Sequence, residues 1–342
     1  MRTIRIILIL AAVLCGLIGP TSCNKEQRSD TGPVTGNNIS TGKTRRIVFI
    51  FKVDGLLYGN ACKAGTEQAT KELPGVTVEY QAPEKAELGK QIEIMQQLIV
   101  QKVDAIVLSP NDANAIAPAI KQAMDAGVKV FTWDSDAPGS QRIFYVAAAD
   151  DVGIGVEIAD HLAADMGNKG KVQIVSGGRV ADNLNLHVKG FEQGFKKHAG
   201  ITLVKPYIYN DDDNEKARSS ASSSLQKDPD IGGFACANSP SAPAVGEALT
   251  QLDKIGKVKV WGLALPSESS KYLKSGAVSG VILWDPSKLT NFTAHLVNDY
   301  LDSKPPVDGA EYPGVGKISY KNGVILMGTT TFTKENIDQF KF

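Results

Sequence analysis

Short apolar runs alternate with segments of helical periodicity along most of the chain. The apolar runs are typical of buried strands, and the segments between them repeat apolar residues every three or four positions, as amphipathic helices do. The first half of the chain predicts, in order, strand 47–51, helix 58–73, strand 76–80, helix 90–101, strand 105–108, helix 115–126 and strand 128–132. This β-α-β-α-β-α-β order indicates a parallel sheet with crossover helices.

The same alternation starts again after Asp150. The expected elements are helix 152–166, strand 172–175, helix 186–198, strand 202–209, helix 215–226, strand 233–235, helix 242–252 and strand 258–262. The chain is therefore expected to fold as α/β, in two consecutive units that each form a doubly wound, Rossmann-like parallel sheet. In such sheets ligands bind outside the carboxyl ends of the strands, so the loops at those ends hold the candidate site residues.

The N-terminal region follows a different pattern. The apolar run 6–18 comes after two arginines and is shorter than the roughly 20 residues that span a bilayer, so it fits the core of a signal peptide. Small residues before Cys23 resemble the lipobox of bacterial lipoproteins. Residues 1–22 are therefore expected to be a lipoprotein signal peptide, with Cys23 as the lipidation site. Because Pro20 replaces the usual lipobox leucine, soluble secretion with cleavage nearby is the alternative.

Residues 23–45 hold the lipidated cysteine and a predicted flexible tether, which is rich in Gly, Ser, Thr, Asn and Lys. No other apolar run is long enough to span a membrane. The sequence thus predicts a protein at the periplasm or cell surface that touches a bacterial membrane only through its lipid anchor.

Composition and charge exclude several functions. The 342 residues are 42% hydrophobic and 22% charged, which is typical of a globular protein. The 37 Lys and Arg balance the 37 Asp and Glu, so no basic excess is present to bind nucleic acid.

Cys62 and Cys236 are either a disulfide or two buried thiols. The acidic run 211–213 lacks the glycine and distal glutamate of a calcium loop and is interpreted as a solvated loop. Since no phosphate loop, HExxH or GxSxG motif is present, no enzyme, cofactor or metal site is expected.

Polar and aromatic side chains follow the predicted strands. Carboxylates and amides form paired hydrogen bonds with vicinal hydroxyls, and an aromatic ring covers the apolar face of a sugar. The alternative is that these residues cap helices and form turns, as Asp and Asn commonly do after strands. The candidate ligand-binding residues are Lys52, Tyr58, Asp134, Asp136, Asp182, Asn183, Asn185, Ala237, Ser239, Trp284 and Asp285.

Four segments carry a resemblance to a known family. They are IVFIFKVDGLLYGNACKAG, DAIVLSPNDANAIAPAIKQAMDAGVKVFTWDSD, GVILWDPSKLT and the terminal FTKENIDQFKF. Together they resemble the periplasmic sugar-binding proteins of bacterial ABC transporters, and among these the branch of autoinducer-2-binding and rhamnose-binding receptors. The resemblance implies a type I periplasmic-binding-protein clamshell, in which two lobes close around a buried ligand and a membrane permease recognises the closed form.

The family pattern also implies where the lobes divide. The N-terminal lobe is expected to comprise residues 46–147 plus 285–326, and the C-terminal lobe residues 148–284 plus 327–342, joined by a three-strand hinge. By the same resemblance the protein is expected to act as a monomer.

The autoinducer-2 receptors imply a role for several positions. Their first-strand Lys and the first Asp of WDSD match Lys52 and Asp134. Their Asp-Gln pair falls at Asp182-Asn183 with a one-residue insertion, or at Asn183-Leu184 without one. The positions whose backbone contacts the ligand fall at Ala237 and Ser239. A related sugar fits better than autoinducer-2, and ribose fits less well, because the ribose receptors' later site residues are altered here.

Three of these residues have two interpretations each. Trp284 either stacks on the ligand or packs beneath it. Asp285 either orients the ligand or joins the hinge. Lys52 follows a buried strand, so it either pairs with Asp134 or Asp136 or also donates to a ligand oxygen.

The expected function is capture of a monosaccharide-like ligand and its delivery to an ABC permease. A sensory receptor for autoinducer-2 or a sugar, feeding chemotaxis or quorum sensing, is the alternative. An enzyme is disfavoured, because no set of nucleophile, base and acid is evident.

Overall fold

The computed structural model describes residues 44–313, 315–340 and 342. The predicted signal peptide, Cys23 and nearly all of the predicted tether lie outside these residues, and the last tether residue, Arg45, begins the first strand. No helix in the described ranges is long and apolar enough to cross a membrane.

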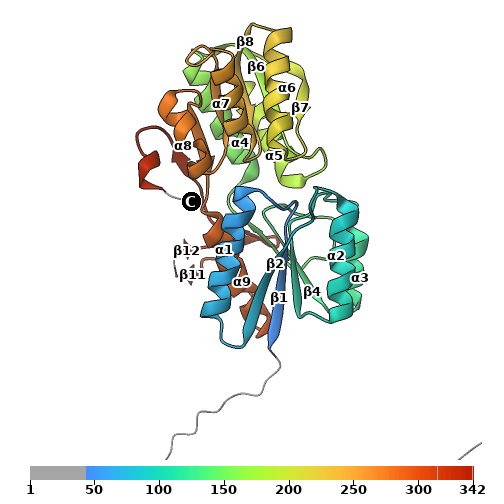
Figure 1. The fold of residues 1–342 in the computed structure, drawn as a ribbon. Coiled ribbons are helices and arrows are strands. Elements are labelled where there is room, and N and C mark those ends of the chain that lie inside the picture. The colour runs from blue at the N-terminus through green and yellow to red at the C-terminus, as the bar shows by residue number, and fades with distance from the viewer. Residues whose placement is uncertain (1–43, 314, 341) are drawn as a thin grey trace, which may run out of the picture. The chain divides into compact units, whose positions relative to one another are not determined.

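The first sheet has seven strands in the order β13-β14-β5-β4-β3-β1-β2. Figure 1 shows β1, β2 and β4 of this sheet with helices on either side. Its pairs are parallel except for β13 with β14. Its strands are β1 (Arg45–Ile50), β2 (Val76–Gln81), β3 (Ala105–Leu108), β4 (Lys129–Trp133), β5 (Tyr145–Ala147), β13 (Ser319–Lys321) and β14 (Val324–Leu326).

Both faces of this sheet are covered by helices, which is why its strands are apolar on both sides. In β1, Val48 and Ile50 face a core shared with α2 (Leu88–Gln101) and α3 (Ala117–Asp125). Ile47 and Phe49 face the opposite core, where α1 (Leu57–Glu72) packs against α9 (Pro286–Leu301).

The second sheet has six strands in the order β15-β10-β9-β8-β6-β7, and only β15 is antiparallel to its neighbour. Its strands are β6 (Lys169–Ser176), β7 (Gly200–Tyr209), β8 (Ile231–Cys236), β9 (Lys259–Leu263), β10 (Gly280–Leu283) and β15 (Thr330–Phe332). The short strands β11 (Glu311–Tyr312) and β12 (Gly316–Lys317) pair separately, and the 3-10 helix η1 (Ile337–Gln339) lies near the C-terminus.

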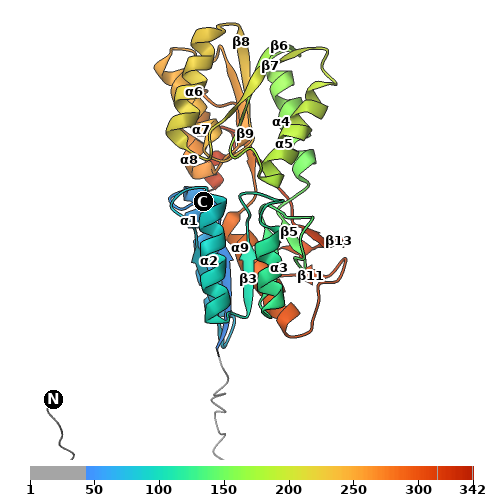
Figure 2. The ribbon, with the colours of Figure 1, turned by 90° about the vertical axis from the view of Figure 1, so that its right-hand side faces the viewer.

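Helices flank the second sheet on both sides (Figure 2). On one side α4 (Asp151–Asp165) packs against α5 (Asp182–Phe195), and on the other α6 (Asn214–Lys227) packs against α7 (Ser241–Gln251), with α8 (Pro266–Ser275) beside α7. The α4–α5 contact is close because two glycines face each other. A side chain at Gly155 would overlap the backbone oxygen of His187, and one at Gly190 would overlap that of Val152.

These two sheets confirm the predicted α/β class and correct one detail. Both sheets are mixed, because each takes an antiparallel strand from the C-terminal part of the chain. The chain leaves the first sheet after β5, returns to it after β10, and passes to the second sheet again after β14. The predicted helix 186–198 begins earlier, at Asp182, so Asp182 and Asn183 belong to its first turn.

The two cysteines in the described residues are free, buried thiols, which settles the alternative of a disulfide. Cys62 packs in α1 and Cys236 ends β8. Burial raises the pKa of both the Cys62 and the Cys236 thiol. Neither thiol is therefore poised to react.

Candidate functional site

A narrow cavity lies at the carboxyl ends of strands from both sheets. Its volume is about 40 Å³, enough for a few water molecules at roughly 10–15 Å³ each. Its lining residues come from the first sheet and the segments that follow its strands, from the segment just before α9, and from the second sheet together with α5. The lining consists of Phe51, Lys52, Leu56, Tyr58, Asp134, Asn183, Leu184, His187, Asp212, Ala237, Asn238, Ser239, Leu263, Leu283 and Trp284.

Asp134 is the centre of the polar network on the first sheet side. It follows β4 with a left-handed backbone (φ 59°) and is 7% exposed. Its Oδ1 accepts a hydrogen bond from the Tyr58 hydroxyl at 2.9 Å, and its Oδ2 accepts one from Ser109 Oγ at 2.8 Å. Lys52 Nζ lies 3.1 Å from the same Oδ2. The ammonium is thus compensated by Asp134, one of the two carboxylates that the sequence offered as its partner.

Lys52 also connects the two sides of the cavity. Its Nζ donates to Asn183 Oδ1 at 2.9 Å, and Asn183 stands in the first turn of α5. The same Oδ1 accepts the N–H of Leu184 at 2.9 Å, which fixes the amide orientation. One buried lysine therefore bridges a carboxylate on one sheet side and an amide on the other.

Trp284 continues the network from the junction before α9. Its indole N–H donates to the Tyr58 hydroxyl at 2.9 Å, and the two rings meet edge to face with centroids 6.2 Å apart. Burial raises the pKa of Tyr58 well above its usual value, so the phenol stays protonated and donates to Asp134. Trp284 both lines the cavity and orders the residues beneath it.

His187 closes the cavity from the second turn of α5. It is 1% exposed, with Nδ1 3.0 Å from the carbonyl oxygen of Ala237 and Nε2 3.0 Å from Oδ1 of Asp151. A carbonyl oxygen only accepts, so Nδ1 carries a proton. A second proton must lie between Nε2 and Asp151, because a lone pair facing a carboxylate would repel it. Burial raises the pKa of Asp151, and the hydrogen bond from His187 opposes that shift.

Seven of the predicted site residues line this cavity. They are Lys52, Tyr58, Asp134, Asn183, Ala237, Ser239 and Trp284.

The other four lie outside the lining, each for an identifiable reason. Asp136 forms an ion pair with Arg142 at 2.6 Å. Asp285 caps α9, accepting the N–H of Ser287 at 3.0 Å. Asn185 donates to the carbonyl oxygen of Arg179 at 3.1 Å. Asp182 is half-buried at the start of α5, and burial raises its pKa.

Three polar residues of the lining were missed from the sequence: His187, Asp212 and Asn238. Asp212 belongs to the acidic run 211–213, which the sequence indicates as a solvated loop, and neither His187 nor Asn238 is among the residues that the sequence predicts for the site. The signal that could have found Asp212 is its place in the short loop after β7, at the same sheet edge as the other candidates.

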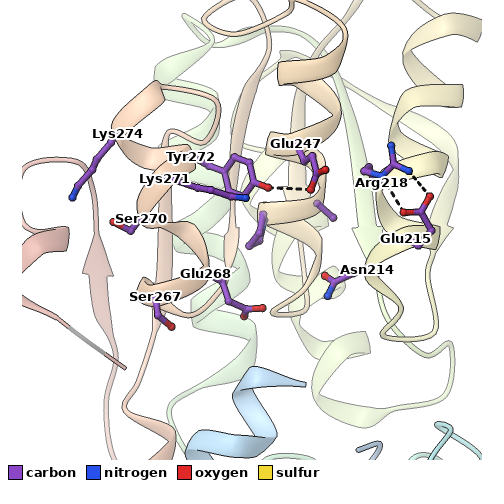
Figure 3. A pocket seen from close by; sticks show the side chains of 12 residues that line it. Asn214, Glu215, Arg218, Glu247, Ser267, Glu268, Ser270, Lys271, Tyr272 and Lys274 are labelled. Atoms are coloured by element: carbon purple, nitrogen blue, oxygen red, sulfur yellow. Dashed lines mark hydrogen bonds and ion pairs between the residues drawn. The ribbon is translucent and has the colours of Figure 1, made fainter. Parts of the chain in front are cut away.

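A larger hollow of about 730 Å³ lies between α6, α7 and α8 (Figure 3). Several of its polar and charged side chains are engaged with one another. Arg218 pairs with Glu215, and the Tyr272 hydroxyl donates to Glu247 at 3.1 Å. Burial raises the pKa of Glu268 to about 7. The hollow is built from helices alone, so the narrow cavity at the strand ends remains the candidate site.

Comparison with known proteins identifies the family. Residues 47–305 match the model of the periplasmic binding protein domain. The chain belongs to this family. The D-ribose/D-allose-binding protein of Pseudomonas aeruginosa is 28% identical over 200 residues, which are 57% of this chain and 62% of that protein.

Solved periplasmic binding proteins share the fold. An ABC transporter solute-binding protein from Clostridium phytofermentas with bound L-rhamnose superimposes with a TM-score of 0.81 at 25% identity, covering 86% of this chain and 98% of that one. LsrB from Clostridium saccharobutylicum in complex with AI-2 gives a TM-score of 0.79 at 25% identity, covering 87% and 100%. These likenesses extend over the two-sheet architecture on which the cavity is built.

Proposed function

We propose that the protein is an extracytoplasmic solute-binding lipoprotein that captures a monosaccharide-like ligand between two lobes and delivers it to an ABC permease. The observation that carries this proposal is the buried Lys52–Asp134 pair, which lies in a cavity lined from both sheets and continues to Asn183 on the far side. Ammonium, carboxylate and amide groups held at fixed positions are suited to the hydroxyls of a small polyol.

The aromatic groups support a sugar over a fully polar ligand. Phe51, Tyr58 and Trp284 line the cavity beside the charged pair. The indole N–H of Trp284 is used by Tyr58, so the remaining contribution of this ring to a ligand is apolar. A sugar ring offers both surfaces that such a site needs, hydroxyls at its edge and C–H groups on its faces.

Binding requires the cavity to widen. A volume of about 40 Å³ is well below the roughly 300–1,000 Å³ of ordinary small-molecule pockets. The Lys52–Asn183 hydrogen bond joins the two sides, so separating them frees one donor and one acceptor for the ligand. We propose rigid-body hinging of the lobes 46–147 plus 285–326 and 148–284 plus 327–342 at the three crossings.

The anchor and the partners belong to the same proposal. Lipidation at Cys23 would hold the receptor at a bacterial membrane, where a permease receives the ligand. L-rhamnose, D-ribose, D-allose and AI-2 are the ligands named for the similar proteins, and all are small and rich in oxygen. No reaction on the ligand is proposed.

The test is a thermal-shift series on the purified chain from residue 24 onward. A ligand that binds only the folded state raises the melting temperature in proportion to the logarithm of its concentration. At least one of D-ribose, D-allose, L-rhamnose and AI-2 is expected to raise it, whereas sorbitol at equal concentration serves as a control for nonspecific polyol effects. Absence of a specific shift in protein first unfolded and refolded to remove bound ligand would overturn the proposal.

A further inference from the structure

The loop after β7 carries three consecutive aspartates that point in different directions. Asp211 is exposed and pairs with Lys216. Asp213 caps α6 by accepting the N–H of Lys216 at 2.7 Å. Asp212 turns the other way and lines the cavity. The acidic run is therefore not uniformly solvated, and its central residue has a separate role to explain.

Asp212 is held in place by a built arrangement. Its backbone is left-handed (φ 59°), and its N–H donates to Asn210 Oδ1 at 2.9 Å. Its Oδ1 accepts a hydrogen bond from Asn238 Nδ2 at 2.7 Å. The carboxylate lies against Gly177, where a Cβ would stand only 2.5 Å from Oδ1. A glycine, two amides and a sparsely populated backbone conformation together direct this one carboxylate into the cavity.

The other charges at the cavity are already balanced. Lys52 and Asp134 lie 3.1 Å apart, and His187 shares a proton with Asp151. Asp212 adds a further carboxylate, and within the described part of the chain no hydrogen bond reaches its Oδ2. Burial raises the pKa of Asp212, and the positive charge of Lys52 opposes that shift. Asp212 is half-buried, which leaves its Oδ2 open to accept a hydrogen bond from a ligand hydroxyl.

We propose that Asp212 is a specificity-determining residue whose Oδ2 accepts a hydrogen bond from a ligand hydroxyl and whose charge excludes anionic sugars. This inference rests on the proposed sugar-binding function and adds a rule for ligand choice. A neutral sugar with a hydroxyl toward β7 is bound. A sugar phosphate or sugar acid places a negative charge beside the half-buried Asp212 carboxylate and is rejected.

The experiment compares Asp212→Asn with the matched control Asp211→Asn. Both residues have left-handed backbones, which asparagine tolerates, and each substitution removes one carboxylate. Only Asp212 faces the cavity. The probes are D-ribose, D-allose, L-rhamnose and D-ribose 5-phosphate, titrated calorimetrically into each protein. Melting temperatures without ligand check the fold.

Asp212→Asn is expected to weaken the best neutral ligand by about 10- to 100-fold, the range of a hydrogen bond to a charged group. The affinity ratio of D-ribose to D-ribose 5-phosphate is expected to fall at least 10-fold, and Asp211→Asn is expected to leave both quantities unchanged. Gly177→Ala displaces the Asp212 carboxylate without changing its chemistry, so it is expected to weaken the binding of neutral sugars in the same way. If Asp212→Asn fails to fold, the Gly177→Ala titration tests the role of Asp212 in its place.

Wild-type neutral affinity in Asp212→Asn and Gly177→Ala would overturn the inference while leaving the proposed function standing. A wild-type protein that binds none of the neutral sugars would overturn both.

Discussion

Removing one member of the buried Lys52–Asp134 pair should destabilise the protein strongly. Both side chains are 6% exposed, and Nζ lies 3.1 Å from Oδ2. At this separation and an effective dielectric constant near 20, the attraction is about 5 kcal/mol. Asp134→Asn keeps the shape of the side chain but leaves the ammonium without its nearest counter-charge, for which losses of about 3–5 kcal/mol are typical. Because Asp212 also lies near enough to interact with Lys52, the lower half of that range is expected.

The double variant Lys52→Met/Asp134→Asn separates charge from packing. It leaves no buried charge at this position, while the substituted side chain at 134 can still accept from Tyr58 or Ser109. Its free energy of unfolding is expected to recover to within about 1.5 kcal/mol of wild type, since replacing both members of a buried pair is often neutral. Urea denaturation of wild type, Lys52→Met, Asp134→Asn and the double variant measures the coupling energy between the two side chains. A loss below about 1 kcal/mol in Asp134→Asn would refute the claim that this ion pair is buried away from bulk water.

Three further predictions follow from contacts elsewhere. Glu268→Gln should stabilise the protein increasingly as pH rises from 5 to 8. Burial raises the pKa of Glu268 from its ordinary value of 4.5 to about 7. Wild type therefore loses stability between these pH values, where the unfolded carboxyl is ionised and the folded one is still protonated, and the loss levels off once the folded carboxyl ionises. Tm against pH measures this, and a pH-independent difference would contradict it. Gly155→Ala should cost about 1–3 kcal/mol in urea melts, because its Cβ overlaps the His187 backbone oxygen, and an unchanged midpoint would show that α4 and α5 separate freely. Trp284→Phe should weaken sugar binding by about 10-fold in calorimetry by releasing Tyr58, whereas unchanged affinity would assign Trp284 to packing alone.

Much of the fold could be predicted from the sequence, because the buried strands of a parallel sheet are continuously apolar. The runs 47–51 and 105–108 are short and continuously apolar, which is typical of strands covered on both faces, and the strands they form pair directly in the first sheet. Strand β5 has three residues, which is too short for a periodic signal. The antiparallel strands β13 and β15 join their sheets through long-range pairing, which local propensity does not encode.

Part of the site could be predicted from the sequence, because side chains that follow the strands meet at one edge of the sheet. Lys52 and Asp134 lie just beyond the ends of β1 and β4, and the sheet brings them together. Asp136 looks equivalent in the sequence, yet Arg142 in the following loop pairs with it and removes it from the cavity lining. Asp285 caps α9, a role that aspartate commonly takes at the residue before a helix. The inward direction of Asp212 depends on a left-handed backbone and the space at Gly177, neither of which a sequence pattern reveals.

The most direct test of the account is calorimetric titration of neutral monosaccharides into the wild-type chain and into Lys52→Met/Asp134→Asn. The account predicts one saturable site per wild-type chain for at least one of D-ribose, D-allose and L-rhamnose. It also predicts that the double variant, shown to be folded by its urea melt, loses at least 100-fold in affinity, because both groups that meet the hydroxyls are gone. Equal affinity in the two proteins would place the ligand elsewhere and contradict the central claim.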